Sequence, residues 1–166
     1  MPIRPIVRFP DPLLRLPANE VTVFDPALSA LCDDLLDTMR AAPGIGITAP
    51  HIGILQRVTV IEIEPGEVRR YVNPKILWSS PDLVTHPEGS VSMPGISEDG
   101  IRARSIRVAY QTCDGDFRED EAEGLLAICL QHEIDQLDGI FWLQKLSRLK
   151  RERAIKRFEK LEKERH

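Results

Sequence analysis

The sequence predicts a single α+β domain spanning residues 1–166, with antiparallel sheets and three helices. Three observations predict this class. Apolar residues recur at helical spacing in separated stretches, and runs rich in β-branched residues lie between them. Pro65-Gly66 and Asp114-Gly115 supply tight turns of the kind that join antiparallel neighbours. With 42% hydrophobic residues, a chain of this length can bury one core.

The N-terminal region divides into an irregular arm and a helix. Residues 1–24 contain five prolines, which are incompatible with a regular helix or a central strand. Asp25 and Pro26 then provide an N-cap and a first-turn proline, so we expect a helix over 26–41. Pro43-Gly44 ends that helix, because proline cannot continue the hydrogen-bond ladder and glycine tolerates an exit turn.

The middle of the chain is predicted to form strands separated by two irregular segments. Clusters of β-branched and apolar residues predict strands over 57–63, 68–72, 75–84, 101–113 and 117–123. We expect the first two of these to form a hairpin. The segments 44–51 and 88–95 are rich in glycine and proline and show no periodicity, so we expect both to be loops.

Two further helices complete the predicted fold. An apolar run at 125–130 predicts a helix over 124–137, which Gly139 ends. A last amphipathic helix is expected over 147–164. Residues 145–165 carry ten Lys and Arg against four Glu, which suits docking to an anionic partner. A solvated helix with ion pairs four residues apart explains the same pattern.

The helix over 124–137 carries an altered metal-binding motif. In the motif H-E-x-x-H, two histidines on one helical face bind Zn²⁺, and the Glu between them takes a proton from the bound water. This chain has His132 and Glu133, but Gln136 stands in place of the second histidine. The helix therefore keeps one ligand and the general base, and it offers an amide where the motif has an imidazole.

Composition also excludes several classes of protein. The chain has no apolar run long enough to span a membrane, and its N-terminus lacks the pattern of a signal peptide. Its three cysteines, Cys32, Cys113 and Cys129, are odd in number and far apart, which argues against a disulfide framework and for a reducing compartment. We therefore expect a cytoplasmic protein with no membrane partner.

Three separated segments resemble peptide deformylase, the bacterial metallohydrolase that removes the formyl group from the N-terminal methionine of new polypeptides. Residues 44–51 resemble the family motif G-I-G-L-A-A-x-Q, residues 88–92 resemble E-G-C-L-S, and residues 132–136 resemble H-E-x-D-H. The resemblance implies a peptide-deformylase-like fold. In that fold antiparallel sheets surround a central helix that bears the third motif, with one N-terminal and one C-terminal helix.

The resemblance also implies a metal site that this chain has lost in part. Family members hold Fe²⁺, or Zn²⁺ or Ni²⁺ in its place, with the Cys of the second motif and both His of the third. Those positions are Ser90, His132 and Gln136 here. A hydroxyl and a carboxamide are poor ligands for these ions. We expect no bound metal, or at most one Fe, Zn or Ni ion, and we expect Ser90, His132, Gln136 and Glu133 to close into a hydrogen-bonded cluster.

The positions that would bind substrate are better retained. By resemblance, His51 and the backbone N–H of Val91 stand where the family binds the formyl oxygen, although the family has Gln in place of His51. The peptide-binding positions correspond to Gly44, Ile45 and Gly46. Cys129 corresponds to part of the pocket for the methionine side chain.

We interpret the chain as a peptide deformylase-like protein without efficient deformylase activity, and with the N-terminal peptide of nascent chains as its partner. One alternative is an atypical but active metal-dependent deformylase that recruits Cys129 or a water. A second is a binding module for N-terminal peptides or for the ribosome, docking through the helix over 147–164. A third is a hydrolytic dyad of Ser90 and His132.

Overall fold

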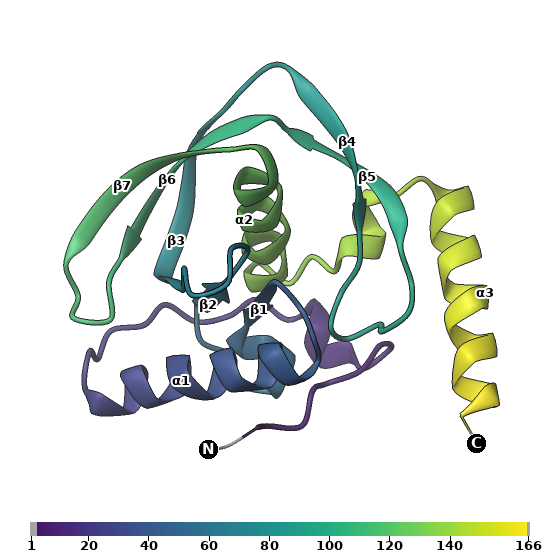
Figure 1. Ribbon diagram of the computed structural model, residues 1–166, viewed down its shortest axis with the longest axis horizontal. Helices are drawn as coiled ribbons and strands as arrows, with labels where there is room; N and C mark the ends of the chain where they lie inside the picture. Colours follow the sequence, from purple (N-terminus) through teal and green to yellow (C-terminus); the bar gives the residue numbers. More distant parts are fainter. Residues whose placement is uncertain (1–2, 166) are drawn as a thin grey trace.

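The computed structural model describes residues 3–165 and shows an α+β fold in which strands arch over one central helix (Figure 1). A five-stranded antiparallel sheet has the order β1-β2-β3-β6-β7, and β4 and β5 form a separate antiparallel pair. The strands are β1 (Gly46–Thr48), β2 (Val58–Ile61), β3 (Arg69–Ser79), β4 (Leu83–Glu88), β5 (Glu98–Ala103), β6 (Ser105–Gln111) and β7 (Phe117–Glu123).

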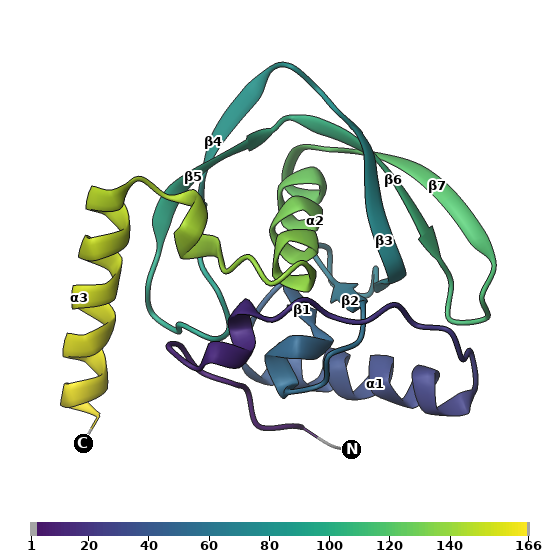
Figure 2. The ribbon, with the colours of Figure 1, turned by 180° about the vertical axis from the view of Figure 1, so that it is seen from behind.

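Three α-helices occupy different sides of this framework. They are α1 (Pro26–Ala41), α2 (Gly124–Leu137) and α3 (Arg148–Glu164). Three short 3-10 helices, η1 (Pro12–Arg15), η2 (Ala49–Ile52) and η3 (Trp142–Lys145), precede α1, β2 and α3 in the chain. Seen from both sides, α2 lies in the middle, α1 crosses one end and α3 stands beside β4 and β5 (Figures 1 and 2). The predicted α+β class, the central helix and the two outer helices are therefore confirmed.

The first helix forms where its capping residues predict. The side chain of Asp25 accepts a hydrogen bond from the Leu28 N–H at 3.3 Å, and Pro26 occupies the first turn. Its apolar stripe, which includes Leu31, Leu35 and Met39, is buried in one core cluster with residues of β1 and β2. Helix α1 therefore covers one face of the large sheet and carries the chain to the segment at 44–51.

Two predicted strands are wrong for one reason: the chain leaves one sheet for the other inside each of them. The predicted strand 75–84 stops at Ser79, and the next strand begins at Leu83 in the small sheet. The predicted strand 101–113 likewise breaks at Arg104 into β5 and β6. The two crossings lie side by side, since the Ser105 N–H donates to the Ser80 hydroxyl at 3.0 Å.

The predicted strands 68–72 and 75–84 are joined rather than separate. Strand β3 runs through Asn73, which has a positive φ of 52° at a register shift against β6. The Asn73 side chain accepts from the Val21 N–H at 2.8 Å and donates to the Val21 C=O at 2.9 Å. These bonds to the N-terminal arm hold the bulge, and arm contacts of this kind cannot be read from the local sequence.

The predicted loop at 44–51 is also wrong, because it contains β1 and most of η2. Strand β1 pairs with β2 and forms one edge of the large sheet. Its first residue, Gly46, lies directly against α2: a Cβ there would be 3.1 Å from the Glu133 carboxylate. Any larger residue at position 46 would push the Glu133 carboxylate aside, because the strand and the motif-bearing helix approach so closely.

The core surrounds α2 on most sides. Its residues Ala127, Leu130 and Ile134 pack with β3, β6 and β7, and α3 joins a third apolar cluster through Ala154 and Phe158. The apolar run seen in the sequence therefore reflects burial among several elements and not a single contact face. Within the described part of the chain, none of the helices has the length and hydropathy needed to cross a membrane.

We predict that Gly139→Ala destabilises the fold more than Gly66→Ala does. Both glycines have positive φ, +80° and +89°, so alanine incurs a similar backbone cost at each position. A Cβ at Gly139 would also be 2.8 Å from the Arg15 C=O, whereas nothing lies within 4 Å at Gly66. The free energy of unfolding measured in urea should fall by about 2 kcal/mol more for Gly139→Ala. Equal losses would contradict the tight contact between the N-terminal arm and the end of α2.

Candidate functional site

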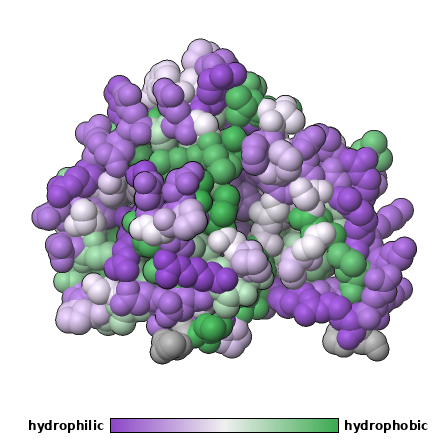
Figure 3. Space-filling view, viewed as in Figure 1, coloured by the Kyte–Doolittle hydropathy of each residue, from purple (hydrophilic) through white to green (hydrophobic). Residues whose placement is uncertain are grey.

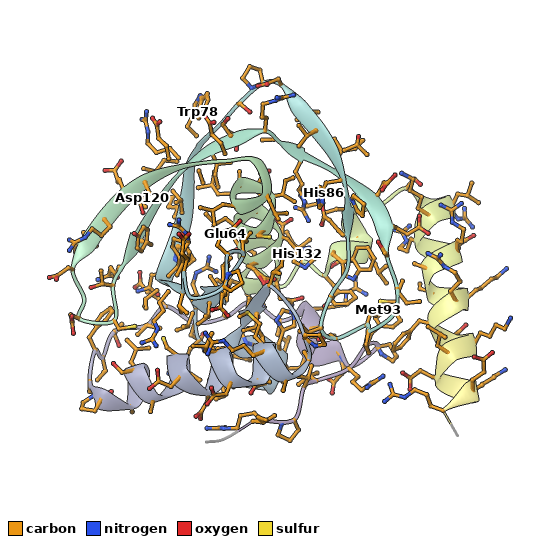
Figure 4. The ribbon with its side chains drawn as sticks, in the orientation of Figure 1. Glu64, Trp78, His86, Met93, Asp120 and His132 are labelled. Carbon is orange, nitrogen blue, oxygen red and sulfur yellow. The ribbon has the colours of Figure 1, made fainter. Side chains whose placement is uncertain are left out.

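A cavity of about 510 Å³ opens between the end of α1, the end of β4, the segment after it and α2. Three of its residues, His86, Met93 and His132, are labelled in Figure 4, on the side of α2 that faces β4 and β5. The surface view of the same face shows an apolar band down the middle, in the position of α2, between hydrophilic residues (Figure 3). The cavity is thus apolar in part and bordered by titratable groups.

The structure brings nearly all the predicted site residues to this cavity. Its lining includes Gly44, Ile45, Gly46, His51, Ser90, Val91, Cys129, His132 and Glu133. Gln136 does not line the cavity: it is 2% exposed, and its side-chain amide donates to the Leu14 C=O at 2.7 Å. One of the two substituted ligand positions has therefore been turned toward the N-terminal arm.

The orientation of His132 is fixed by a buried ion network. The His132 Nδ1–H donates to the Glu88 carboxylate at 2.9 Å, and Arg102 holds the same carboxylate with two hydrogen bonds of 2.9 Å. Arg102 also pairs with Asp135, one turn along α2. A Cβ at Gly100 would be 2.5 Å from Glu88, so only glycine leaves room for this carboxylate. The network leaves His132 Nε2 as the nitrogen available for other contacts.

The network also sets the protonation of the site. Burial alone would raise the pKa of Glu88, but its bonds to Arg102 and His132 outweigh burial and hold that pKa at about 2. For His132, burial lowers the pKa, yet the Glu88 bond and the nearby carboxylates raise it overall. Burial raises the pKa of Glu133, whose Oε2 has no hydrogen-bond partner among the described residues.

His51 presents a single unpaired donor. The Thr48 N–H donates to His51 Nδ1 at 2.9 Å, so Nδ1 carries no proton and Nε2 must carry it in the neutral ring. Burial, followed by the charge of His132, lowers the pKa of His51 to about 3, which keeps the ring neutral. Its Nε2 is buried and has no partner among residues 3–165. An N–H group of this kind suits an uncharged or anionic oxygen acceptor.

The predicted cluster of Ser90, His132, Gln136 and Glu133 is wrong. Gln136 bonds to Leu14, and the Ser90 hydroxyl accepts from the Ser92 N–H at 3.1 Å. Only His132 and Glu133 remain close, with Nε2 and Oε1 3.7 Å apart. The Glu88 carboxylate orients His132 as a Ser90–His132 hydrolytic dyad would require. Among residues 3–165, however, no hydrogen bond joins the Ser90 hydroxyl to His132.

The residues present do not fit the metal that the family motif implies. Of the three ligand positions, only His132 directs a strong donor into the cavity, since Ser90 offers a neutral hydroxyl and Gln136 is turned away. Burial and the carboxylates of Glu133 and Glu88 raise the pKa of Cys129 to about 12, so its thiol stays protonated. Among the described residues, no three His, Cys, Asp or Glu side chains group closely enough to hold an ion.

Glu88, Arg102 and Asp135 are the site residues that the sequence left without a role. Glu88 and Asp135 lie inside the motif-like segments 88–92 and 132–136, and this location in the sequence could have marked both as site residues. Arg102 lies outside these segments. It is buried only because β5 packs against α2, which the local sequence does not indicate.

Comparisons with known proteins agree with the fold and the motifs. The sequence model described as polypeptide deformylase matches residues 3–152. A protein named peptide deformylase-like from Rhizobium meliloti is 63% identical over 96% of this chain and 94% of its own length. A peptide deformylase from Methylocella silvestris is 46% identical over 96% of this chain and 85% of its own.

Solved structures lead to the same assignment. The crystal structure of a peptide deformylase from Legionella pneumophila superposes with a TM-score of 0.93 at 38% identity, covering 99% of this chain and 98% of that one. Fold, motif order and sequence relatives thus agree along nearly the whole chain. The chain belongs to the polypeptide deformylase family.

Proposed function

We propose that this protein binds the formylated N-terminal peptide of nascent chains and does not hydrolyse it efficiently. The observation that carries the proposal is the unpaired Nε2–H of His51, held in one tautomer by Thr48 at the wall of the cavity. Val91 lines the same cavity, and the described hydrogen bonds include none from its backbone N–H. Two fixed donors would bind the formyl oxygen without needing a metal.

The surroundings of these donors suit a peptide that begins with methionine. Leu125, Ile128 and Cys129 give one wall of the cavity an apolar surface of the type that accepts a thioether side chain. Strand β1 is an edge strand, so its outer backbone groups would pair with an extended peptide main chain. Binding of this kind uses backbone and apolar contacts that the two lost ligands do not affect.

We propose that hydrolysis is weak because the side chains at the family's metal-ligand positions are poor metal ligands. Formamide cleavage requires an activated water, and Glu133 could take the proton of that water, but a bound metal ion is what would make the water acidic enough. The single imidazole of His132 and the hydroxyl of Ser90 are insufficient to fix an ion of the family's type. We therefore assign the cavity to recognition and propose a cytoplasmic location, where formylated chains are made.

A docking role for α3 is the second part of the proposal. Arg153 and Arg157 bind Glu98 of β5, so this face of the helix is used inside the molecule. Lys156, Lys160 and Lys163 form an exposed stripe at spacings of four and three residues, and the described ion pairs include none of them. This stripe would contact the phosphates of ribosomal RNA.

We predict that His51→Phe weakens binding of a formyl-Met peptide by about tenfold or more, because the formyl oxygen loses a buried donor. Affinity for the same peptide with a free amine should change little, since that ligand lacks the formyl oxygen. Isothermal titration calorimetry with the two peptides measures the difference. His51→Gln is the matched control, because its amide can accept from Thr48 and still donate into the cavity. Failure of the wild-type protein to bind either peptide would refute the proposal.

Restoring the two metal-ligand positions provides a second prediction. Ser90→Cys combined with Gln136→His should bring about one Fe, Zn or Ni ion per chain and measurable formyl-Met peptide hydrolysis. Each single variant should resemble the wild type, which we expect to contain almost no metal by elemental analysis after anaerobic purification. One ion per wild-type chain together with hydrolysis would establish the alternative, an atypical active deformylase.

Reversing the lysine stripe tests the docking role. Lys156→Glu, Lys160→Glu and Lys163→Glu together should abolish co-sedimentation with ribosomes at low salt, because all three phosphate contacts become repulsive.

The matched control reverses three exposed charges on the large sheet. Arg69→Glu, Lys75→Glu and Arg118→Glu change the net charge by the same amount, and these residues take part in none of the described ion pairs. Ribosome binding should survive in this control. Equal loss in both triple variants would mean that net charge, and not the α3 stripe, governs the association.

A further inference from the structure

Two cysteines that the candidate site does not use face each other at the first half of α1, away from the cavity. Cys32 is fully buried in α1, and Cys113 lies partly buried in the turn between β6 and β7. Their Sγ atoms are 3.4 Å apart, although 81 positions separate them in the chain. In both ribbon views the tip of the β6–β7 hairpin bends down to the N-terminal part of α1 (Figures 1 and 2).

The turn that carries Cys113 is held rigidly against the helix. The Thr112 hydroxyl accepts hydrogen bonds from the N–H groups of Asp114 and Asp116 at 3.3 and 3.2 Å. Gly115 has a φ of +89°, and a Cβ there would be 3.3 Å from the ring of Phe24. The hairpin tip therefore rests on the residues that lead into α1, which keeps the two sulfur atoms in place.

The surroundings make the two thiols chemically unequal. The hydrogen bond from Cys32 lowers the pKa of Cys113 to about 6 against the effect of burial, and Arg70 acts in the same direction, while the charge of Asp114 opposes it. The same bond and burial raise the pKa of Cys32. Arg70 is positioned by its ion pair with Asp33 at 2.8 Å. Cys113 thus supplies a partly accessible thiolate, and Cys32 is a protonated neighbour behind it.

We propose that Cys32 and Cys113 are a redox modification site, which hydrogen peroxide converts into a disulfide that fastens α1 to the β6–β7 hairpin. The Cys113 thiolate attacks one peroxide oxygen, an S–O bond forms, the O–O bond breaks, and the hydroxide that leaves is protonated to water. Cys32 then attacks the sulfenic sulfur, the S–S bond forms, and the departing hydroxide takes the Cys32 proton as a second water. Two thiols are oxidised and one peroxide is reduced.

The third cysteine provides an internal contrast. Cys129 lies in the cavity, and burial raises the pKa of its thiol to about 12, so it offers little thiolate to an oxidant. Its reactivity should therefore be much lower than that of Cys113.

A disulfide between positions 32 and 113 closes a long loop in the unfolded chain, so the oxidised protein should be the more stable form. Disulfides that form in reducing compartments are typically transient and redox-sensing.

The test treats the whole protein with hydrogen peroxide and measures intact mass, free thiols and thermal unfolding. We expect the wild type to lose two hydrogen atoms and two of its three free thiols, and its Tm to rise by roughly 10 °C. Dithiothreitol should reverse all three changes. Cys129→Ser should behave in the same way, because Cys129 takes no part.

Cys32→Ser and Cys113→Ser should abolish the loss of two hydrogen atoms and the rise in Tm. Cys32→Ser should instead accumulate added oxygen on Cys113, since the resolving thiol is gone. Three results would overturn the proposal: added oxygen on wild-type Cys113 without a disulfide, equal reaction of all three thiols, or a disulfide-linked dimer in place of the internal bond. Because the variants are compared by mass as well as by stability, a poorly folding variant does not conceal the outcome.

Discussion

The buried carboxylate of Glu88 is the interaction on which the site depends. It ends β4, accepts two hydrogen bonds from Arg102 of β5 and one from His132 of α2, and so joins the small sheet to the central helix. Charges this deeply buried are tolerated only with partners, and breaking such a pair costs about 3–5 kcal/mol. Arg102 extends the connection to Asp135, so the arrangement is held at two points along α2.

This network orients His132 independently of positions 90 and 136, the other two positions of the family's ligand set. The contacts that orient His132 come from Glu88 and not from the residues at the substituted positions, Ser90 and Gln136. Gln136 instead helps to hold the N-terminal arm at Leu14. Gln136 therefore serves a structural contact, while the ring nitrogens of His51 and His132 are oriented by other residues, Thr48 and Glu88.

The cavity lies at the C-terminal end of α1 and the thiol pair at its first half, so the helix connects them physically. Its last residues lead directly into the cavity wall at Ala42 and Pro43, while Cys32 contacts the hairpin tip nearer its start. Helix α1 is also packed along β1, the edge strand to which we assign peptide binding. A bond at Cys32 would therefore restrain the same element that positions the peptide-binding edge.

The sequence by itself determined the three helices, the antiparallel class and a set of site residues of which all but Gln136 line the cavity, because capping residues, apolar periodicity and three motif-like segments are local signals. It could not determine where the chain changes sheets at Arg104, nor the bulge at Asn73, since both depend on contacts with distant segments. The partner of Gln136 and the pairing of Cys32 with Cys113 were equally undetermined. Hydrogen bonds and thiol contacts between residues so far apart in the chain exist only after the core has closed, so only the tertiary structure decided them.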